Sequence, residues 1–252
     1  MALKVVSFDL WDTVIHDDSD EPKRAAMGLK SKVDERRHLV AEALERAGHA
    51  VDVKAVSEAY DKADEAFNKA WKGDHITWPI RQRLELVLTN LGHTLSDDLM
   101  NEVVKAHEQM ELVIKPDPVH GVVDAVRDLA GRYQLCVVSD AIVSPGKALR
   151  QILHSYGVDR FFDSYAFSDE IGHSKPHKGM FQHVADELGV TFEEMVHVGD
   201  RDHNDVKGPQ ALGMKAILFT ATRDTDKETT SADAICERHG DLPAIVDRLA
   251  AN

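Results

Sequence analysis

The chain has 252 residues, enough to bury one core with an insertion or two smaller cores. Its formal net charge of −14 argues against nucleic acid as a partner, because binding to a phosphate backbone needs clustered Lys and Arg. We find no apolar run of the roughly 18–20 residues of a membrane span, and no pattern of a secretory signal at the N-terminus. Since two Cys suggest a reducing compartment, we expect a cytoplasmic protein with no membrane association.

The first predicted element is a buried strand that ends in polar residues. Residues 5–8 are Val-Val-Ser-Phe, and Asp9, Asp12 and Thr13 follow shortly after them. Such an apolar run is typical of the parallel strands of an α/β sheet. Ligands of these sheets bind just beyond the carboxyl ends of the strands. Asp9 is therefore a candidate nucleophile or metal ligand, with a turn or helix-capping acid as the alternative.

The next hundred residues predict helices. Residues 16–22 are rich in acids and include Pro22, which indicates a linker that leaves the sheet. From about residue 24 to residue 114, apolar residues recur every three or four positions. Gly48 and Gly73 indicate helix ends, and Ser96 indicates a helix start. Four helices with short connections predict a small antiparallel bundle.

From residue 116 onward, predicted strands alternate with predicted helices. The strands are expected near residues 133–140, 161–168, 195–200, 216–219 and 234–235. This alternation predicts a parallel sheet with right-handed crossovers. The fold class is therefore α/β, a Rossmann-like parallel sheet core with an inserted all-helical cap domain. We place the core at residues 1–15 and 116–252 and the cap at residues 16–115.

Chemically active side chains follow three of these strands and one loop. They are Asp9, Ser139, Lys175 and Asp200. Each alone has an ordinary explanation as a cap, a solvated charge or a turn residue. Together, and in this order, they resemble the four motifs of the haloacid dehalogenase-like (HAD) hydrolases with a helical cap. The resemblance covers nearly the whole chain, and its most specific part is residues 199–205, Gly-Asp-Arg-Asp-His-Asn-Asp.

The resemblance implies an enzyme that hydrolyses a small anionic substrate. Asp9 would attack phosphorus and form an aspartyl-phosphate, which splits one displacement into two. Ser139 would donate a hydrogen bond to a phosphoryl oxygen, and Thr13 would help to bind the same group. Lys175 would supply a fixed positive charge for substrate binding and catalysis.

The resemblance also implies Mg²⁺ as the cofactor. Mg²⁺ prefers oxygen ligands and relieves the repulsion between a carboxylate and a phosphate. Asp9, Asp200 and the backbone carbonyl of Trp11 would be the ligands. Asp205 would bind the metal directly or through water.

One position differs from the family pattern. The second Asp of the first motif, which protonates the leaving group in family phosphatases, is replaced by Trp11. General acid–base catalysis contributes roughly 10²–10⁴-fold, so another residue has to supply it. Asp12 or His16 is a candidate, and the protein is then a Mg²⁺-dependent phosphatase. We favour this interpretation because Asp200 and Asp205 are both retained.

Three alternatives remain open. Family 2-haloacid dehalogenases also lack the second Asp, but they work without metal. Phosphonate hydrolases lack it, keep the metal, and use a cap lysine as a Schiff base. The candidate lysines by location are Lys30, Lys32, Lys54, Lys62, Lys69 and Lys72. A non-catalytic phosphate-binding protein is the third alternative. In each case we expect a monomer or a homodimer.

Overall fold

The computed structural model describes residues 2–251 and contains a six-stranded, fully parallel sheet with the strand order β3-β2-β1-β4-β5-β6. The strands are β1 (Val5–Phe8), β2 (Gln134–Ser139), β3 (Ser164–Phe167), β4 (Met195–Gly199), β5 (Lys215–Phe219) and β6 (Ala234–Cys236). All lie in segments that the sequence predicted, so the α/β fold class is confirmed. Because β1 lies between β2 and β4, the carboxyl ends of these three strands meet at one edge.

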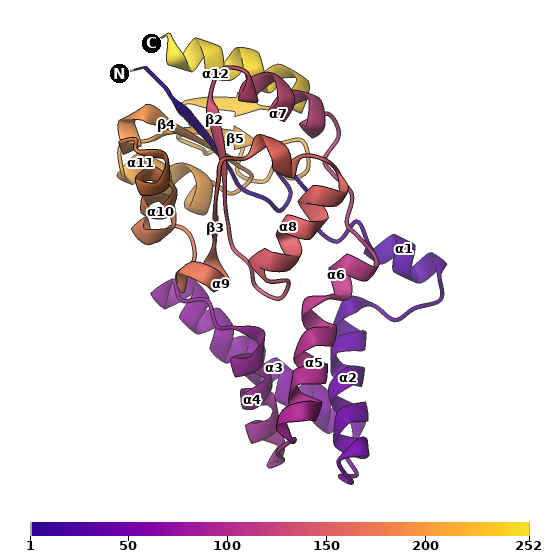
Figure 1. Ribbon diagram of the computed structural model, residues 1–252. Coiled ribbons are helices and arrows are strands. Elements are labelled where there is room, and N and C mark those ends of the chain that lie inside the picture. The colour runs from indigo at the N-terminus through magenta and orange to yellow at the C-terminus, as the bar shows by residue number, and fades with distance from the viewer. Residues whose placement is uncertain (1, 252) are drawn as a thin grey trace.

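Helices cover both faces of the sheet. One face carries α7 (Val122–Ala130), α8 (Gly146–Ser155) and α12 (Leu242–Ala250), and the other carries α10 (Lys178–Leu188) and the short α11 (Gly208–Ala211) (Figure 1). Neighbouring strand residues alternate between the two cores. Phe8 and Val137 pack with the first group of helices, and Val5 and Val138 pack with α10. Burial on both faces explains why the strands are almost continuously apolar.

A helical insertion connects β1 to β2. It contains α1 (Glu21–Ala26), α2 (Lys32–Arg46), α3 (Val53–Lys69), α4 (Ile80–Leu91), α5 (Asp97–Glu108) and α6 (Met110–Val113). In Figure 1, α2 to α5 form a bundle that extends away from the sheet. The bundle buries its own apolar cluster, which includes Leu44, Tyr60 and Leu84. This separate cluster supports a cap domain, whose bounds at residues 16 and 115 stay a prediction.

Two local features differ from the expectation. The segment predicted as a linker already contains the start of α1, because Pro22 lies in the first turn, where its missing N–H is not needed. After β4 the chain forms a π-helical turn, Asp202–Lys207, before α11. This turn returns Asp205 to the end of β4. A side chain at Gly199 would overlap the Asp205 carboxylate, so a glycine is required there.

Several short elements complete the described chain. A second π-helical turn, Ala70–Asp74, follows α3, and α9 (Ser168–Ile171) follows β3. The 3-10 turns are Asp159–Phe161, Phe192–Glu194 and His239–Asp241. None of the helices within residues 2–251 combines the length and the apolar character needed to cross a bilayer.

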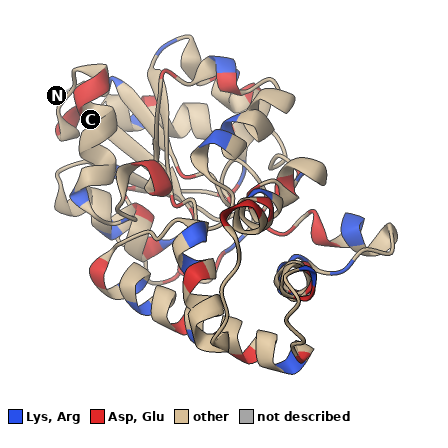
Figure 2. Ribbon diagram, turned by 60° about the horizontal axis from the view of Figure 1, so that its bottom comes forward, with Lys and Arg blue, Asp and Glu red and all other residues tan. Residues whose placement is uncertain are grey.

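Acidic and basic residues are interspersed over both the sheet region and the helical bundle (Figure 2). The excess of acid is therefore spread over the molecule. An anionic substrate is mildly repelled by such a surface at long range. Any attraction of an anion would have to come from individual basic side chains.

Candidate active site

Asp9 lies at the carboxyl end of the central strand β1. Its backbone N–H donates to the carbonyl of Val198 at 2.8 Å, which continues the pairing of β1 with β4. Its Oδ1 is 2.7 Å from Nζ of Lys175, and both side chains are buried. Burial alone lowers the pKa of Lys175, but the carboxylates of Asp205, Asp9 and Asp140 raise it well above its ordinary value. The structure thus joins the predicted nucleophile to a lysine that keeps its charge.

Asp200 and Asp205 complete an acidic cluster with Asp9. One carboxylate oxygen of each lies within 4.8 Å of the others. Burial, together with the charges of Asp9 and Asp205, raises the pKa of Asp200 to about 8. The Oδ2 atom of Asp200 is buried and has no hydrogen-bond partner among residues 2–251. A crowded set of oxygen donors with an unsatisfied oxygen fits a hard divalent cation.

Asp205 is held by several donors. Its carboxylate accepts hydrogen bonds from Nζ of Lys175 at 2.6 Å and from the backbone N–H of Arg201 at 3.0 Å. Nε2 of His197 lies 3.3 Å away, and Nδ1 of this histidine is 2.8 Å from Oγ of Ser7. Burial alone raises the pKa of Asp205. The neighbouring Lys175 and His197 have the larger effect and lower this pKa well below its usual range.

His197, which contacts Asp205, was not among the site residues expected from the sequence. The signal that could have found it is the pair of polar residues, Ser7 and His197, in two strands that are otherwise apolar. These residues are direct partners in the pairing of β1 with β4. Both are completely buried, so each must be satisfied by the other or by a neighbour.

Asp140 was also missed, although it follows β2 directly. Its Oδ1 accepts the backbone N–H of Lys175 at 2.9 Å, and its Oδ2 accepts the indole N–H of Trp71 at 3.1 Å. Burial raises the pKa of Asp140 to about 6, against the opposing effect of Lys175. Asp140 therefore connects the loop that carries Lys175 to the π-helical turn of the insertion.

The two predicted substrate-binding hydroxyls are completely buried. Oγ of Ser139, at the end of β2, and Oγ1 of Thr13 have no hydrogen-bond partner within residues 2–251. The backbone carbonyl of Thr13 is 2.7 Å from Nε2 of His239, which fixes the turn after β1. Neither hydroxyl group belongs to a residue that lines the cavity described next. Their roles in substrate binding stay predictions.

A cavity of about 240 Å³ lies between the core and the insertion. The core contributes Asp9, Trp11, Asp140, Lys175 and Arg201 to its lining. The insertion contributes Lys32, Arg36 and Trp71. A second cavity of about 590 Å³ shares Trp71, Lys175 and Arg201 with it.

The acids that follow Trp11 differ in their access to this cavity. Asp12 has a left-handed backbone with φ of 54°, and its Oδ1 accepts the backbone N–H of Asp17 at 3.2 Å. The same oxygen is 3.5 Å from Nδ1 of His16. Asp17 lines the cavity, whereas Asp12 does not. Burial and the neighbouring Asp18 raise the pKa of Asp17 to about 6. Asp12 as the proton donor stays a prediction, and Asp17 is a candidate that sequence analysis missed.

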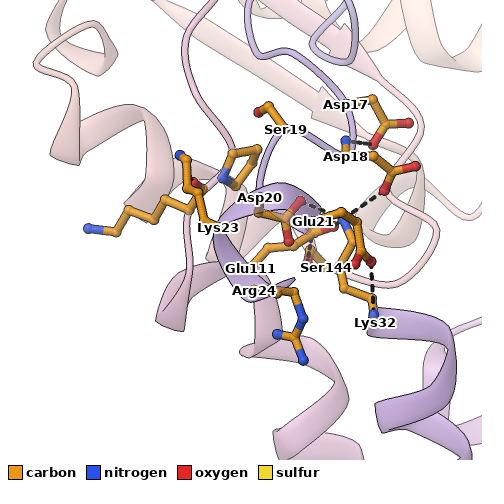
Figure 3. Close-up of polar contacts among 12 residues, drawn as sticks. Asp17, Asp18, Ser19, Asp20, Glu21, Lys23, Arg24, Lys32, Glu111 and Ser144 are labelled. Atoms are coloured by element: carbon orange, nitrogen blue, oxygen red, sulfur yellow. Dashed lines mark hydrogen bonds and ion pairs between the residues drawn. The ribbon is translucent and has the colours of Figure 1, made fainter. Parts of the chain in front are cut away.

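The buried Lys32 is the centre of an ionic cluster with the buried Asp20 and Glu111 and the exposed Asp18 (Figure 3). Its Nζ is 2.9 Å from Asp18, 2.8 Å from Asp20 and 2.9 Å from Glu111. The hydroxyl of Ser144 donates to the other oxygen of Glu111. Burial alone lowers the pKa of Lys32. The effect of Glu111 and the other acids is larger and raises this pKa above its ordinary value. A Schiff base requires a neutral amine, so this environment opposes the phosphonate hydrolase alternative at Lys32.

The fold and the acidic site at the carboxyl edge of its sheet are those of a Rossmann-like enzyme with a helical insertion. The model of the haloacid dehalogenase-like hydrolase family matches residues 3–213. The chain belongs to this family, and it is a hydrolase.

Curated relatives of this chain are phosphatases. The glyceraldehyde 3-phosphate phosphatase of Methanopyrus kandleri is 29% identical over 165 residues, which cover 64% of this chain and 68% of the relative. The enzyme of the same name from Methanocaldococcus jannaschii is 27% identical, with 57% of this chain and 61% of the relative covered. The phosphoglycolate phosphatase of Salmonella typhi is 26% identical over 86% of this chain and 81% of its own length.

Solved structures with the same fold include both phosphatases and dehalogenases. The 2-haloacid dehalogenase of Pseudomonas syringae pv. tomato has a TM-score of 0.67 and 21% identity, covering 98% of this chain and 99% of the other. The HAD phosphatase of Thermococcus onnurineus has a TM-score of 0.65 and 20% identity, covering 97% and 98%. At these identities the likeness establishes the fold alone, and chemistry has to be argued from the site.

Proposed function

We propose that the protein is a Mg²⁺-dependent phosphatase that hydrolyses a small phosphorylated metabolite through an aspartyl-phosphate on Asp9. The observation that carries this proposal is the buried cluster of Asp9, Asp200 and Asp205, with Oδ2 of Asp200 unsatisfied among the described residues. Lys175 pairs with Asp9 and Asp205, and Asp200 has only Arg201 at 3.8 Å. The raised pKa of Asp200 indicates that this positive charge does not fully compensate the three acids. The phosphatase names of the curated relatives agree with the proposal.

The cluster would hold Mg²⁺ through Asp9, Asp200 and the backbone carbonyl of Trp11. When bound, the ion neutralises charge between the carboxylates and an anionic phosphoryl group. Asp205 already accepts hydrogen bonds from Lys175 and from the backbone of Arg201. We therefore assign Asp205 the role of fixing Lys175 and of orienting the cation site.

The reaction would take place in two displacements. A carboxylate oxygen of Asp9 attacks phosphorus, the bond from phosphorus to the leaving oxygen breaks, and the leaving group takes up a proton. Water then attacks the aspartyl-phosphate, which releases inorganic phosphate and restores Asp9. Lys175 stabilises the charge on the phosphoryl oxygens, and the hydroxyls of Ser139 and Thr13 are the donors we assign to the same oxygens.

Asp17 is the residue we favour as the proton donor in place of the family acid. Asp17 lines the same cavity as Asp9, and its raised pKa of about 6 keeps part of its carboxyl groups protonated near neutral pH. Asp12, which the sequence suggested, remains the alternative. Its carboxylate is directed toward the backbone of Asp17 and toward His16.

A 2-haloacid dehalogenase is the second candidate. The observation in its favour is that Trp11, which replaces the acid of family phosphatases, lines the cavity. A halide leaves without protonation, so a dehalogenase does not need that acid. Against it, a dehalogenase has no need for the buried acidic cluster, which fits a metal. The phosphatase therefore accounts for more of the site.

The test is hydrolysis of p-nitrophenyl phosphate and acetyl phosphate, each with Mg²⁺ and with EDTA. Both have leaving groups that need little protonation, so the result does not depend on which acid replaces the family residue. We expect phosphate release from both that requires Mg²⁺ and is lost in Asp9→Asn. No release, together with halide release from 2-chloropropionate in EDTA, would identify the dehalogenase. Phosphate binding without any turnover would identify a non-catalytic protein.

A further inference from the structure

We propose that Arg36 of α2 binds a carboxylate of the substrate at the end remote from phosphorus, so that the substrate is a small phosphorylated carboxylic acid. This inference rests on the proposed phosphatase function and specifies its substrate class. It concerns a residue in the insertion that the sequence motifs do not include.

The position of Arg36 supports this role. Arg36 lines the same cavity of about 240 Å³ as Asp9 and Lys175, from the opposite, helical side. Lys32 lies four residues earlier on α2 and also lines the cavity. Residues four apart lie on one face of a helix, so α2 presents this face toward the nucleophile. A substrate attached to Asp9 through phosphorus would therefore extend toward Arg36.

The guanidinium of Arg36 is partly buried and lacks a protein partner. Within residues 2–251 it forms no ion pair, and its Nε is buried without a hydrogen-bond partner. Two neighbouring arginines, in contrast, form ion pairs with acids of the protein. Arg37 pairs with Asp61 at 2.8 Å, and Arg83 pairs with Asp64 at 2.7 Å. An arginine keeps its charge in a protein, so removal from water without a partner is costly, and a bound anion would compensate for that cost.

Two of the acids that line the cavity with Arg36 are already engaged. One oxygen of Glu111 binds Lys32, and the other accepts the hydroxyl of Ser144. Asp18 also binds Lys32 (Figure 3). The ionic cluster around Lys32 thus occupies these carboxylates and leaves the donors of Arg36 for a ligand.

The surroundings favour a carboxylate over a second phosphate. Asp17, Asp18 and Glu111 line the cavity together with Arg36. They repel a group of charge near −2 more strongly than a group of charge −1. The planar fork of a guanidinium matches a carboxylate with two parallel hydrogen bonds.

The experiment compares two substrates with the same carbon chain, 3-phosphoglycerate and glycerol 3-phosphate, which differ in a carboxylate. We expect the wild type to prefer 3-phosphoglycerate, mainly through KM. Arg36→Met should reduce the ratio of the two kcat/KM values roughly 10- to 100-fold. Arg37→Met is the matched control, because Arg37 is engaged by Asp61 and does not line this cavity, and it should leave the ratio unchanged.

If Arg36→Met does not fold, as judged by circular dichroism and thermal unfolding, the Arg36→Lys variant is used to test the substrate preference instead. Lysine keeps the charge but lacks the planar fork, so the preference should fall several-fold. An equal ratio in the wild type and the folded variant would overturn the proposal. A preference for 1,2-ethanediol bisphosphate that depends on Arg36 would also overturn it, because the subsite would then bind phosphate.

A binding measurement separates this inference from the proposed function. We would titrate 3-phosphonopropionate and propylphosphonate, which are not cleaved as esters, into the wild type and Arg36→Met with Mg²⁺ present. Tighter binding of the carboxylated compound that is lost in the variant supports the subsite, even if no phosphate ester is hydrolysed. In that case the phosphatase proposal fails and the carboxylate subsite stands.

Discussion

The indole N–H of Trp71 donates a hydrogen bond to Oδ2 of Asp140 at 3.1 Å and so joins the helical insertion to the edge of the sheet. The other oxygen of Asp140 accepts the backbone N–H of Lys175 at 2.9 Å. On the insertion side, Trp71 stacks on Phe67 of α3, with the two rings 5° from parallel. The carboxylate of Asp140 therefore links the insertion to the loop of Lys175, beside the direct hydrogen bond from the backbone N–H of Ser174 to the carbonyl of His75 at 2.9 Å.

The first prediction concerns this link. Trp71→Phe keeps an aromatic ring beside Phe67 but leaves Oδ2 of Asp140 without its donor. Loss of one partner of a buried group costs about 1–3 kcal/mol, so urea unfolding should show a loss of this size. We also expect kcat/KM to fall several-fold, because the loop of Lys175 is less firmly held. Trp78→Phe is the control, since Trp78 packs near Phe67 with ring centroids 5.9 Å apart and forms no bond to Asp140. Wild-type stability and activity in Trp71→Phe would contradict the coupling.

The second prediction concerns the nucleophile. Asp9→Asn should lower kcat on the order of 10³-fold or more, because the amide cannot form the aspartyl-phosphate. The chain should still fold, since the two side chains have the same shape and Lys175 retains its ion pair with Asp205. Circular dichroism and thermal unfolding would verify the fold. Wild-type turnover of a verified substrate by this variant would show that Asp9 is not the nucleophile.

The third prediction distinguishes the two candidate proton donors. Asp17→Asn should slow hydrolysis of an alkyl phosphate roughly 10²–10⁴-fold and have a much smaller effect on p-nitrophenyl phosphate, whose leaving group needs little protonation. Because the acid must be protonated, the alkyl phosphate rate should fall as pH rises above the pKa of Asp17, about 6. Asp12→Asn is the matched comparison. If Asp12→Asn shows the selective loss and Asp17→Asn does not, the assignment passes to Asp12.

The fourth prediction concerns stability against pH. His107 is buried, with Nε2 2.8 Å from the hydroxyl of Tyr60 and Nδ1 2.7 Å from the carbonyl of Val103. Burial lowers its pKa from 6.5 to about 4, so the unfolded chain takes up this proton first as pH falls. The contribution of the neutral histidine is fully present above about pH 6.5 and is lost progressively down to about pH 4.

At pH 5 this loss amounts to about 2 kcal/mol relative to pH 7. Urea unfolding at the two pH values measures it, with His107→Gln as the comparison. The variant should be less stable than the wild type at pH 7, and the difference should shrink at pH 5. A difference that stays constant with pH would show that His107 does not titrate in this range.

The sequence by itself determined the class of fold and the order of the main site residues. Strands buried on both faces leave continuous apolar runs, and the helices of the insertion leave a period of three to four residues, so both are visible without a structure. Parallel strands bring their carboxyl ends to one edge, which is why Asp9, Ser139 and Asp200 were predicted to converge.

The tertiary structure alone decided which polar groups meet across distant segments. Trp71 and Asp140 are 69 residues apart, and Ser7 and His197 are 190 apart. A hydrophobic pattern states which face of an element is buried, but it does not state which buried polar group will satisfy another. That depends on the packing of the elements and on the direction of each side chain. For the same reason Arg36 could be recognised as an unpaired charge only once the structure had placed α2 across the cavity from Asp9.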